Sequence, residues 1–192
     1  MLTNEKSAIK HMDSCFNIVF QDVGKIILKN NPENKSRLFV KILAKLCLNK
    51  TIDFTIEENR KLYRIGRGEQ GVLLVRPYTN LICAHWRFVN EDVARKSANK
   101  IYSMFCEYKK QQDFIGMDMA RKFLEMGFTR ARRYANHPSG KKYASDGSVS
   151  PQSPTALHCE KSRSATVFKK MRDKAAYDEK YVIMRKEWRS QE

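Results

Sequence analysis

The pattern of apolar and polar positions changes character twice along the chain. Residues 1–50 carry apolar side chains at mixed spacings of three and four, which predicts two helices separated by Asn30-Asn31-Pro32. The second of these, over residues 35–47, has lysines opposite its apolar stripe. Such a helix can bind a membrane or a partner, but packing against a core is favoured. We therefore expect a helical N-terminal extension over residues 1–50.

The middle of the chain has the composition of β-strands. Two short runs, residues 61–65 and 72–75, are rich in β-forming residues and flank a loop that contains three glycines. This arrangement predicts a β-hairpin, and residues 85–88 supply a candidate third strand. In such a strand, alternate side chains point to opposite faces of the sheet. Trp86 and Phe88 would then pack in the core.

A helical pattern returns after residue 90. Asn90 followed by two acidic residues predicts a helix start, and Asp113 predicts the next one, which we expect Gly127 to end. Residues 139–157 are rich in Ser, Gly and Pro and predict a flexible loop, followed by two short basic helices. The predicted fold class is α+β, a small antiparallel sheet packed by several helices. Residues 51–192 would form this single domain.

The charge balance suggests a class of partner. The 37 Lys and Arg residues against 21 Asp and Glu residues give a formal net charge of +16, which favours a polyanionic partner. The alternative is that lysine simply fills the surface. Five cysteines without a close pair predict neither a disulfide framework nor a metal site, and no cofactor is expected. We expect an intracellular protein without a membrane span, cytoplasmic, or nuclear in a eukaryote.

The glycine-rich loop is the first candidate site. Glycine allows the backbone N–H groups to approach an anion closely, and arginine adds bidentate contacts. The candidate ligand-binding residues here are Arg64, Arg67 and Gly68, and Glu69 is a candidate catalytic partner. The loop lacks the Lys and Ser or Thr of a phosphate-binding P-loop. An ordinary hairpin with exposed arginines is the alternative.

The second candidate site is the pair His85 and Arg87. If residues 85–88 form a strand, these two side chains share the face opposite Trp86 and Phe88. Arg87 could then hold an anion while His85 moves a proton. A histidine held by ordinary hydrogen bonds is the alternative. We also consider Asp118, which has Arg121 three residues later and would form a surface ion pair worth a few tenths of a kcal/mol.

The third candidate site is the densest. Five cationic residues and no carboxylate lie between residues 130 and 142. Arginines interleaved with aromatic residues are typical of phosphate contacts combined with base stacking. The candidate ligand-binding residues are Arg130, Arg132, Arg133, Tyr134 and Asn136, and His137 is a second candidate proton carrier. The alternative is a solvated basic helix end whose cations favour the helix dipole.

Three strings within these segments are similar to a known family. They run from Leu62 to Leu73, from His85 to Phe88, and from Gly116 to His137 with a short interruption. On these strings, residues from about 52 to 188 resemble domain of unknown function 4385, found in bacteria, phages and some eukaryotes. The resemblance implies a shared fold and a shared site but no reaction. Residues 1–50 and the Ser- and Pro-rich stretch depart from the family pattern.

Three classes of function remain open. The first is a module that binds nucleic acid or a nucleotide phosphate through the arginines of the three blocks. The second is an enzyme on a phosphorylated or other anionic substrate, with His85 or His137 as proton carrier and Asp118 or Glu69 as its partner. The third is a structural or interaction protein. Convergence of arginines, a histidine and a carboxylate in one concave pocket would favour the enzyme, and an open groove would favour binding.

Overall fold

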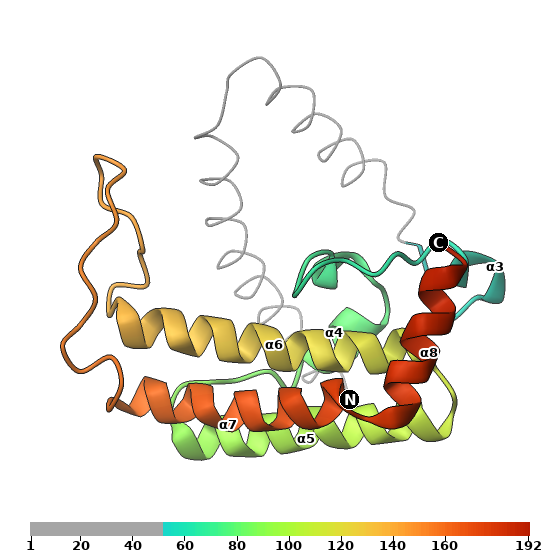
Figure 1. Cartoon of the computed structure of the whole chain (residues 1–192). Coiled ribbons are helices and arrows are strands. Elements are labelled where there is room, and N and C mark those ends of the chain that lie inside the picture. Colours follow the sequence, from blue (N-terminus) through green and yellow to red (C-terminus); the bar gives the residue numbers. More distant parts are fainter. Residues whose placement is uncertain (1–51) are drawn as a thin grey trace, which may run out of the picture. The chain divides into compact units, whose positions relative to one another are not determined.

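The structure is a computed structural model that describes residues 52–192 (Figure 1). Residues Phe54–Glu192 group into one compact unit. The helices predicted within residues 1–50 lie outside the described residues. The described elements are, in chain order, α3 (Glu57–Arg60), the 3₁₀ helix η1 (Val72–Leu74), α4 (Tyr78–Cys83), α5 (Glu91–Lys110), α6 (Phe114–Asn136), α7 (Glu160–Ala176) and α8 (Glu179–Ser190).

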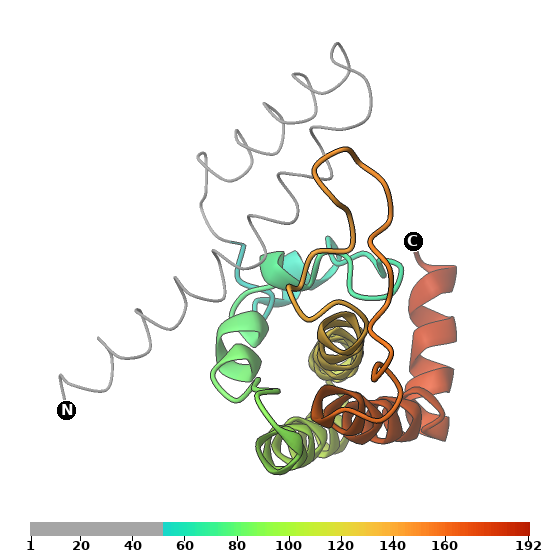
Figure 2. The same cartoon turned by 90° about the vertical axis from the view of Figure 1, so that its left-hand side faces the viewer.

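Three long helices, α5, α6 and α7, make the core. Figure 1 shows them running alongside one another, with α6 antiparallel to both neighbours, and Figure 2 looks nearly along their axes. Helix α6 is buried on almost all sides along its first half, including positions occupied by charged residues. Asn90 caps α5 by accepting from the Val93 N–H, and Asp113 caps α6 by accepting from the Gly116 N–H, as predicted. These caps fix where both helices begin.

Two glycines allow the helices to approach closely. A Cβ at Gly116 would lie 2.4 Å from the Tyr108 ring on α5, and a Cβ at Gly127 would lie 2.4 Å from the Phe168 ring on α7. The prediction that Gly127 ends the helix is wrong, because α6 continues to Asn136. Gly127 lies in the middle of the helix, where it makes room for Phe168 and does not serve as a C-cap.

The predicted α+β class is wrong as well. Residues 52–192 contain helices and connecting segments but no β-sheet; an isolated bridge pairs Tyr143 with Val149. The described part of the chain is therefore all-α. The expected hairpin over residues 61–75 is replaced by tight turns and the 3₁₀ helix η1.

The apolar residues of the expected hairpin are buried against helices. Tyr63, Ile65, Val72 and Val75 are all buried. Their backbone groups form local bonds, such as those from the Tyr63 N–H to the Arg60 carbonyl and from the Leu74 N–H to the Gly71 carbonyl, where a ladder between strands was expected. Their burial thus reflects packing against helices, which the sequence pattern alone does not distinguish from packing in a sheet.

Residues 85–88 follow α4 as an irregular segment, so the expected third strand is wrong. The core packing predicted for Trp86 holds, since this residue is buried and its ring lies 6.2 Å from that of Phe123. At the other end of the unit, the two predicted C-terminal helices are α7 and α8, and Figure 1 shows α8 crossing the end of the long helices. No helix in residues 52–192 is long and apolar enough to span a bilayer.

Candidate functional site: a buried ionic cluster and a basic pocket on the same helix

The first half of α6 carries a buried ionic cluster centred on Asp118, which is fully inaccessible. The phenol groups of Tyr63 and Tyr181 each donate a hydrogen bond of 2.5 Å to this carboxylate, one to each oxygen. Arg121 lies 3.1 Å and Lys122 3.3 Å from it. Both lone-pair directions of the carboxylate are therefore engaged by donors from three parts of the chain.

The cluster keeps Asp118 ionised. Burial alone would raise the pKa of this carboxyl, but the charges of Arg121 and Lys122, aided by the two phenol donors, outweigh burial and lower the pKa to about 2. Burial, and then the nearby carboxylate, raise the pKa of both Tyr63 and Tyr181. The phenols consequently stay protonated at any physiological pH and serve as fixed donors.

The cations of the cluster also fasten the glycine-rich segment onto α6. Arg121 donates to the carbonyl of Gly68 and Lys122 to that of Gln70, each at 3.4 Å. Arg185 from α8 adds a third cation, 3.4 Å from Asp118, and donates to the Tyr181 hydroxyl at 2.8 Å. The ion pair that was expected at the surface is thus part of a buried network. This network holds α6, α8 and residues 63–70 together.

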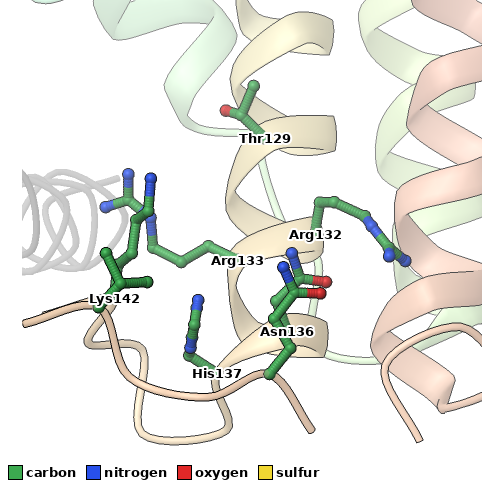
Figure 3. Close-up of a pocket in the computed structure, with 8 residues that line it drawn as sticks. Thr129, Arg132, Arg133, Asn136, His137 and Lys142 are labelled. Atoms are coloured by element: carbon green, nitrogen blue, oxygen red, sulfur yellow. The ribbon is translucent and has the colours of Figure 1, made fainter. Parts of the chain in front are cut away.

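The second polar region is a pocket at the C-terminal end of α6, where the chain leaves the helix and returns through residues 137–159. The pocket has a volume of about 250 Å³ and is lined by Thr129, Arg132, Arg133, Asn136, His137, Lys142, Val149 and Gln152 (Figure 3). Figure 3 shows the side chains of Arg133 and Lys142 extending to the same side of the helix, with the His137 ring directed toward that side. These lining residues include no aspartate or glutamate.

Two polar atoms in this pocket are buried without a hydrogen-bond partner among the described residues. They are Nδ1 of His137 and Oδ1 of Asn136. His137 is only 6% exposed, so water has little access to its ring. Buried polar groups in folded proteins are nearly always hydrogen-bonded, and leaving one unsatisfied costs about 1–3 kcal/mol. Two residues of the pocket lining therefore each carry a covered polar atom that no described residue satisfies.

The carboxylate of Glu69 is linked to the pocket by a hydrogen bond from one lining residue, Thr129. The Thr129 hydroxyl, whose side chain lines the pocket, donates to Glu69 at 2.8 Å. Of the first predicted block, Glu69 is thus the residue brought to the third block. Arg64 instead donates to the carbonyls of Lys61 and Tyr63, and Arg67 is exposed.

The arginines of the third block diverge. Arg133 lines the pocket, whereas the Arg132 guanidinium extends to the opposite side, where it donates to the Ala156 carbonyl and the Ser162 hydroxyl (Figure 3). Arg130 is buried within α6. The Tyr134 ring lies 6.2 Å from the Phe88 ring. Tyr134 therefore packs within the unit, a different surrounding from the open stacking surface expected for a base.

The second predicted block lies apart from these groups. Arg87 donates through its side chain to the carbonyls of Cys83 and Trp86, at the end of α4, and its backbone N–H donates to Ser97. His85 is exposed, but partial desolvation of its ring, followed by the charges of Lys100 and Arg87, lowers the pKa of this imidazole. His85 is therefore neutral at physiological pH and has neither Asp118 nor Glu69 among the hydrogen-bond partners that the structure gives it.

Several residues of the two regions were absent from the sequence prediction. Lys142 was assigned only to the flexible loop, although the run of cations that ends at this residue was a usable signal. Tyr63 and Tyr181 are separated by more than a hundred positions, and no spacing rule connects them to Asp118. Within residues 52–192, no group of three or more His, Cys, Asp or Glu side chains could hold a metal ion.

The described structure is thus an all-α domain with one closed ionic cluster and one basic pocket. The chain belongs to the family described as Domain of unknown function (DUF4385), whose model matches residues 48–191. This membership agrees with the resemblance carried by the three sequence strings. No curated protein and no solved structure matches the chain.

Proposed function

We propose that the protein binds a phosphate-bearing polyanion, nucleic acid in the first instance, through the basic pocket at the end of α6. The observation that carries the proposal is the pocket itself: Arg133 and Lys142 line it together with the buried His137, whose Nδ1 has no partner among the described residues. Cationic donors around a recess without a lining carboxylate suit phosphate oxygens. The net charge of +16 supports attraction of such a ligand from a distance.

The last-turn cations also have an ordinary role. The carbonyl end of a helix carries a partial negative charge that arginine or lysine stabilises. This role explains cations near the helix end but requires no recess and no buried imidazole. The recess that Arg133 and Lys142 line is what separates a binding site from dipole compensation.

The test is the salt dependence of oligonucleotide binding by the full chain. Bound phosphates release counterions, so the logarithm of the binding constant should fall with the logarithm of salt concentration by about 0.9 per phosphate on duplex and about 0.7 on single strands. Lys142→Gln should reduce both affinity and slope. Lys186→Gln, which removes the same charge from an exposed position on α8, is the matched control. Binding that is absent at about 50 mM salt, or equal loss in both variants, contradicts the proposal.

A second candidate function rests on the bond between Thr129 and Glu69. This bond puts a carboxylate beside a pocket that also contains His137, the combination expected of an enzyme acting on a phosphorylated substrate. The measurement is release of inorganic phosphate from a panel of phosphate esters. Glu69→Gln should abolish release while leaving ligand affinity nearly unchanged. If no ester in the panel is turned over, binding alone accounts for the pocket.

A further inference from the structure

The segment that borders the basic pocket contains two serines that precede prolines. Residues 149–154 read Val-Ser-Pro-Gln-Ser-Pro, and Val149 and Gln152 line the pocket. Residues 150–153 form no helix or strand. A residue before proline is held in an extended backbone conformation, because the proline ring clashes with it in the helical one. Proline also has no backbone N–H, so a protein kinase that accepts Ser-Pro requires no hydrogen bond from the residue after the serine. The segment therefore has the form of a substrate for a proline-directed kinase.

The first of these serines, Ser150, lies opposite Lys142, one of the cations that line the pocket. An isolated antiparallel bridge pairs Tyr143 with Val149, and the Ser150 N–H donates to the Lys142 carbonyl at 2.9 Å. This register makes Ser150 and Lys142 cross-strand neighbours, and the side chains of such a pair lie on the same face with their Cβ atoms roughly 5 Å apart. A group attached to the Ser150 oxygen is therefore within reach of the long lysine side chain.

Lys142 is able to turn to a partner of this kind. Its side chain is exposed, and its ammonium lies 5.5 Å from the centroid of the Tyr143 ring, an attraction that is weak at an exposed site. The residues that line the pocket include no aspartate or glutamate. A phosphate on Ser150 carries a charge of about −1.5 to −2 at neutral pH, more than one lysine neutralises. Such a phosphate would pair with Lys142 and also repel a second anion from the pocket.

The segment can open for a kinase while the long helices stay folded. Besides the Ser150 bond, its own backbone bonds join the Ala144 N–H to the Ser148 carbonyl and the Gly147 N–H to the Ala144 carbonyl. Figure 1 shows the chain after α6 extending away from the long helices before it returns to α7. Exposed segments held by few hydrogen bonds open locally at a small cost in free energy. Ser150 is therefore accessible to an enzyme through local opening alone.

From these contacts we infer that Ser150 is a phosphorylation site whose phosphate pairs with Lys142 and closes the basic pocket to nucleic acid. The inference rests on the proposed function, because it assigns a regulation to the same pocket. A proline-directed kinase supplies the phosphoryl group from ATP. The Ser150 oxygen forms a bond to the γ-phosphorus, the bond from that phosphorus to the leaving ADP oxygen breaks, and the hydroxyl proton passes to the catalytic carboxylate of the kinase.

The first experiment tests the modification. The full chain is incubated with magnesium, ATP and a proline-directed protein kinase, and the phosphorylated residues are located by mass spectrometry. Ser150 should carry phosphate, and Pro151→Ala, which keeps the serine, should lose most of it. A protein that stays unmodified, or that is modified at Ser153 but not at Ser150, overturns the inference.

The second experiment tests the pairing and is independent of any nucleic acid. Phosphorus NMR follows the second pKa of the Ser150 phosphate in a Ser153→Ala background, where this is the remaining Ser-Pro site of the sequence. That pKa is about 6 for an unpaired phosphoserine. Pairing with the Lys142 ammonium should lower it, because a neighbouring cation favours the dianion, and Lys142→Gln should return it toward its ordinary value. Equal pKa values in the two proteins overturn the inference.

The third experiment tests the effect on binding with a single-stranded oligonucleotide. Phosphorylation of Ser150 should lower affinity at least about tenfold at about 50 mM salt and should reduce the salt slope by about 0.7, the loss of one phosphate contact. Ser150→Asp should act in the same direction without a kinase. Its matched control is Ser145→Asp, which adds the same charge to an exposed position in the turn beyond the bridge. Equal losses in the two Asp variants would mean general repulsion and overturn the inference.

The outcomes separate the inference from the proposed function. If the phosphorylated and unmodified proteins bind the oligonucleotide equally while Lys142→Gln still weakens binding, the inference fails and the proposed function stands. If the unmodified protein binds no oligonucleotide, or if Lys142→Gln has no more effect than Lys186→Gln, the proposed function fails and the regulation of the pocket fails with it.

Discussion

The two polar regions of α6 contain similar kinds of residue but differ in whether their buried polar groups are hydrogen-bonded. Near the start of the helix, Asp118 is surrounded by phenol, guanidinium and ammonium donors at 2.5–3.4 Å. Near its end, Asn136 and His137 each bury a polar atom that no described residue satisfies. The first region completes its own hydrogen bonds, and the second leaves two polar atoms without a partner among the described residues.

This contrast shows that burial of charge is a poor guide to a binding site by itself. The Asp118 cluster has the strongest pKa shift of any carboxyl among residues 52–192, a feature often taken to mark an active site. Its hydrogen bonds nevertheless run to its own helix, to α8 and to the glycine-rich segment. In the basic pocket, by contrast, two lining residues each have a buried polar atom without a partner among the described residues. The recess with its cationic lining, and not the size of a pKa shift, identifies the candidate site.

The largest expected effect is on the closed region. Asp118→Asn removes the charge that compensates Arg121 and Lys122, so two buried or nearly buried cations lose their counter-ion. Breaking a buried ion pair from one side costs about 3–5 kcal/mol. Urea denaturation should show a loss of this size, and Glu187→Gln, an exposed change on α8, should alter stability by less than about 0.5 kcal/mol. Similar stability of the two variants would mean that the cluster is not a structural centre.

The second expected effect is an acid transition from the same carboxyl. Its pKa is depressed from 3.8 to about 2 on folding, so the stabilisation is complete above about pH 4 and is lost as pH falls toward 2. The shift corresponds to about 2 kcal/mol at 1.36 kcal/mol per unit. Denaturation midpoints measured from about pH 5 to about pH 2 should fall more steeply for the unaltered protein than for Asp118→Asn. Parallel curves would contradict the assignment.

The sequence predicted the helices better than their surroundings. Asn90 and Asp113 were identified as caps because capping depends on a side chain and a backbone group only three residues away. The hairpin over residues 61–75 was wrong because short runs of β-forming residues around a glycine-rich loop can also pack as turns against helices, and which one occurs depends on distant partners. Gly127 was assigned to a helix end because the close approach of Phe168 on α7 is a tertiary contact that no local pattern contains.

The candidate site was predicted in part for the same reason. The density of cations from Arg130 to Lys142 identified the right end of α6. The directions of individual side chains could not be derived, since Arg132 and Arg133 are adjacent and yet extend to different sides (Figure 3). The Asp118 cluster was not predicted as a buried network because Tyr63 and Tyr181, which bond to it, lie far from it in the sequence.

A smaller effect tests whether the basic pocket binds through the geometry of its donors or through net charge alone. Arg133→Lys keeps the charge but removes the planar, forked donor set, so we expect ligand binding to weaken by at least about 1 kcal/mol. Lys141→Arg, an exposed position outside the pocket lining, should change little. The measurement is a parallel titration of both variants with the oligonucleotide that the unaltered protein binds most tightly. Equal and negligible effects would show that the segment supplies bulk charge only.

The smallest expected effect separates the two regions most sharply, because its sign differs. His137→Leu replaces an imidazole whose Nδ1 is buried and unsatisfied among the described residues by an apolar group of similar size. Removing an unsatisfied polar group should leave the unliganded protein unchanged or up to about 1 kcal/mol more stable, while ligand binding falls. The control is His158→Leu at an exposed position, for which neither stability nor binding should change. A loss of stability by His137→Leu comparable to that of Asp118→Asn would place both regions in the same structural role, and the distinction between a closed cluster and an open site would not hold.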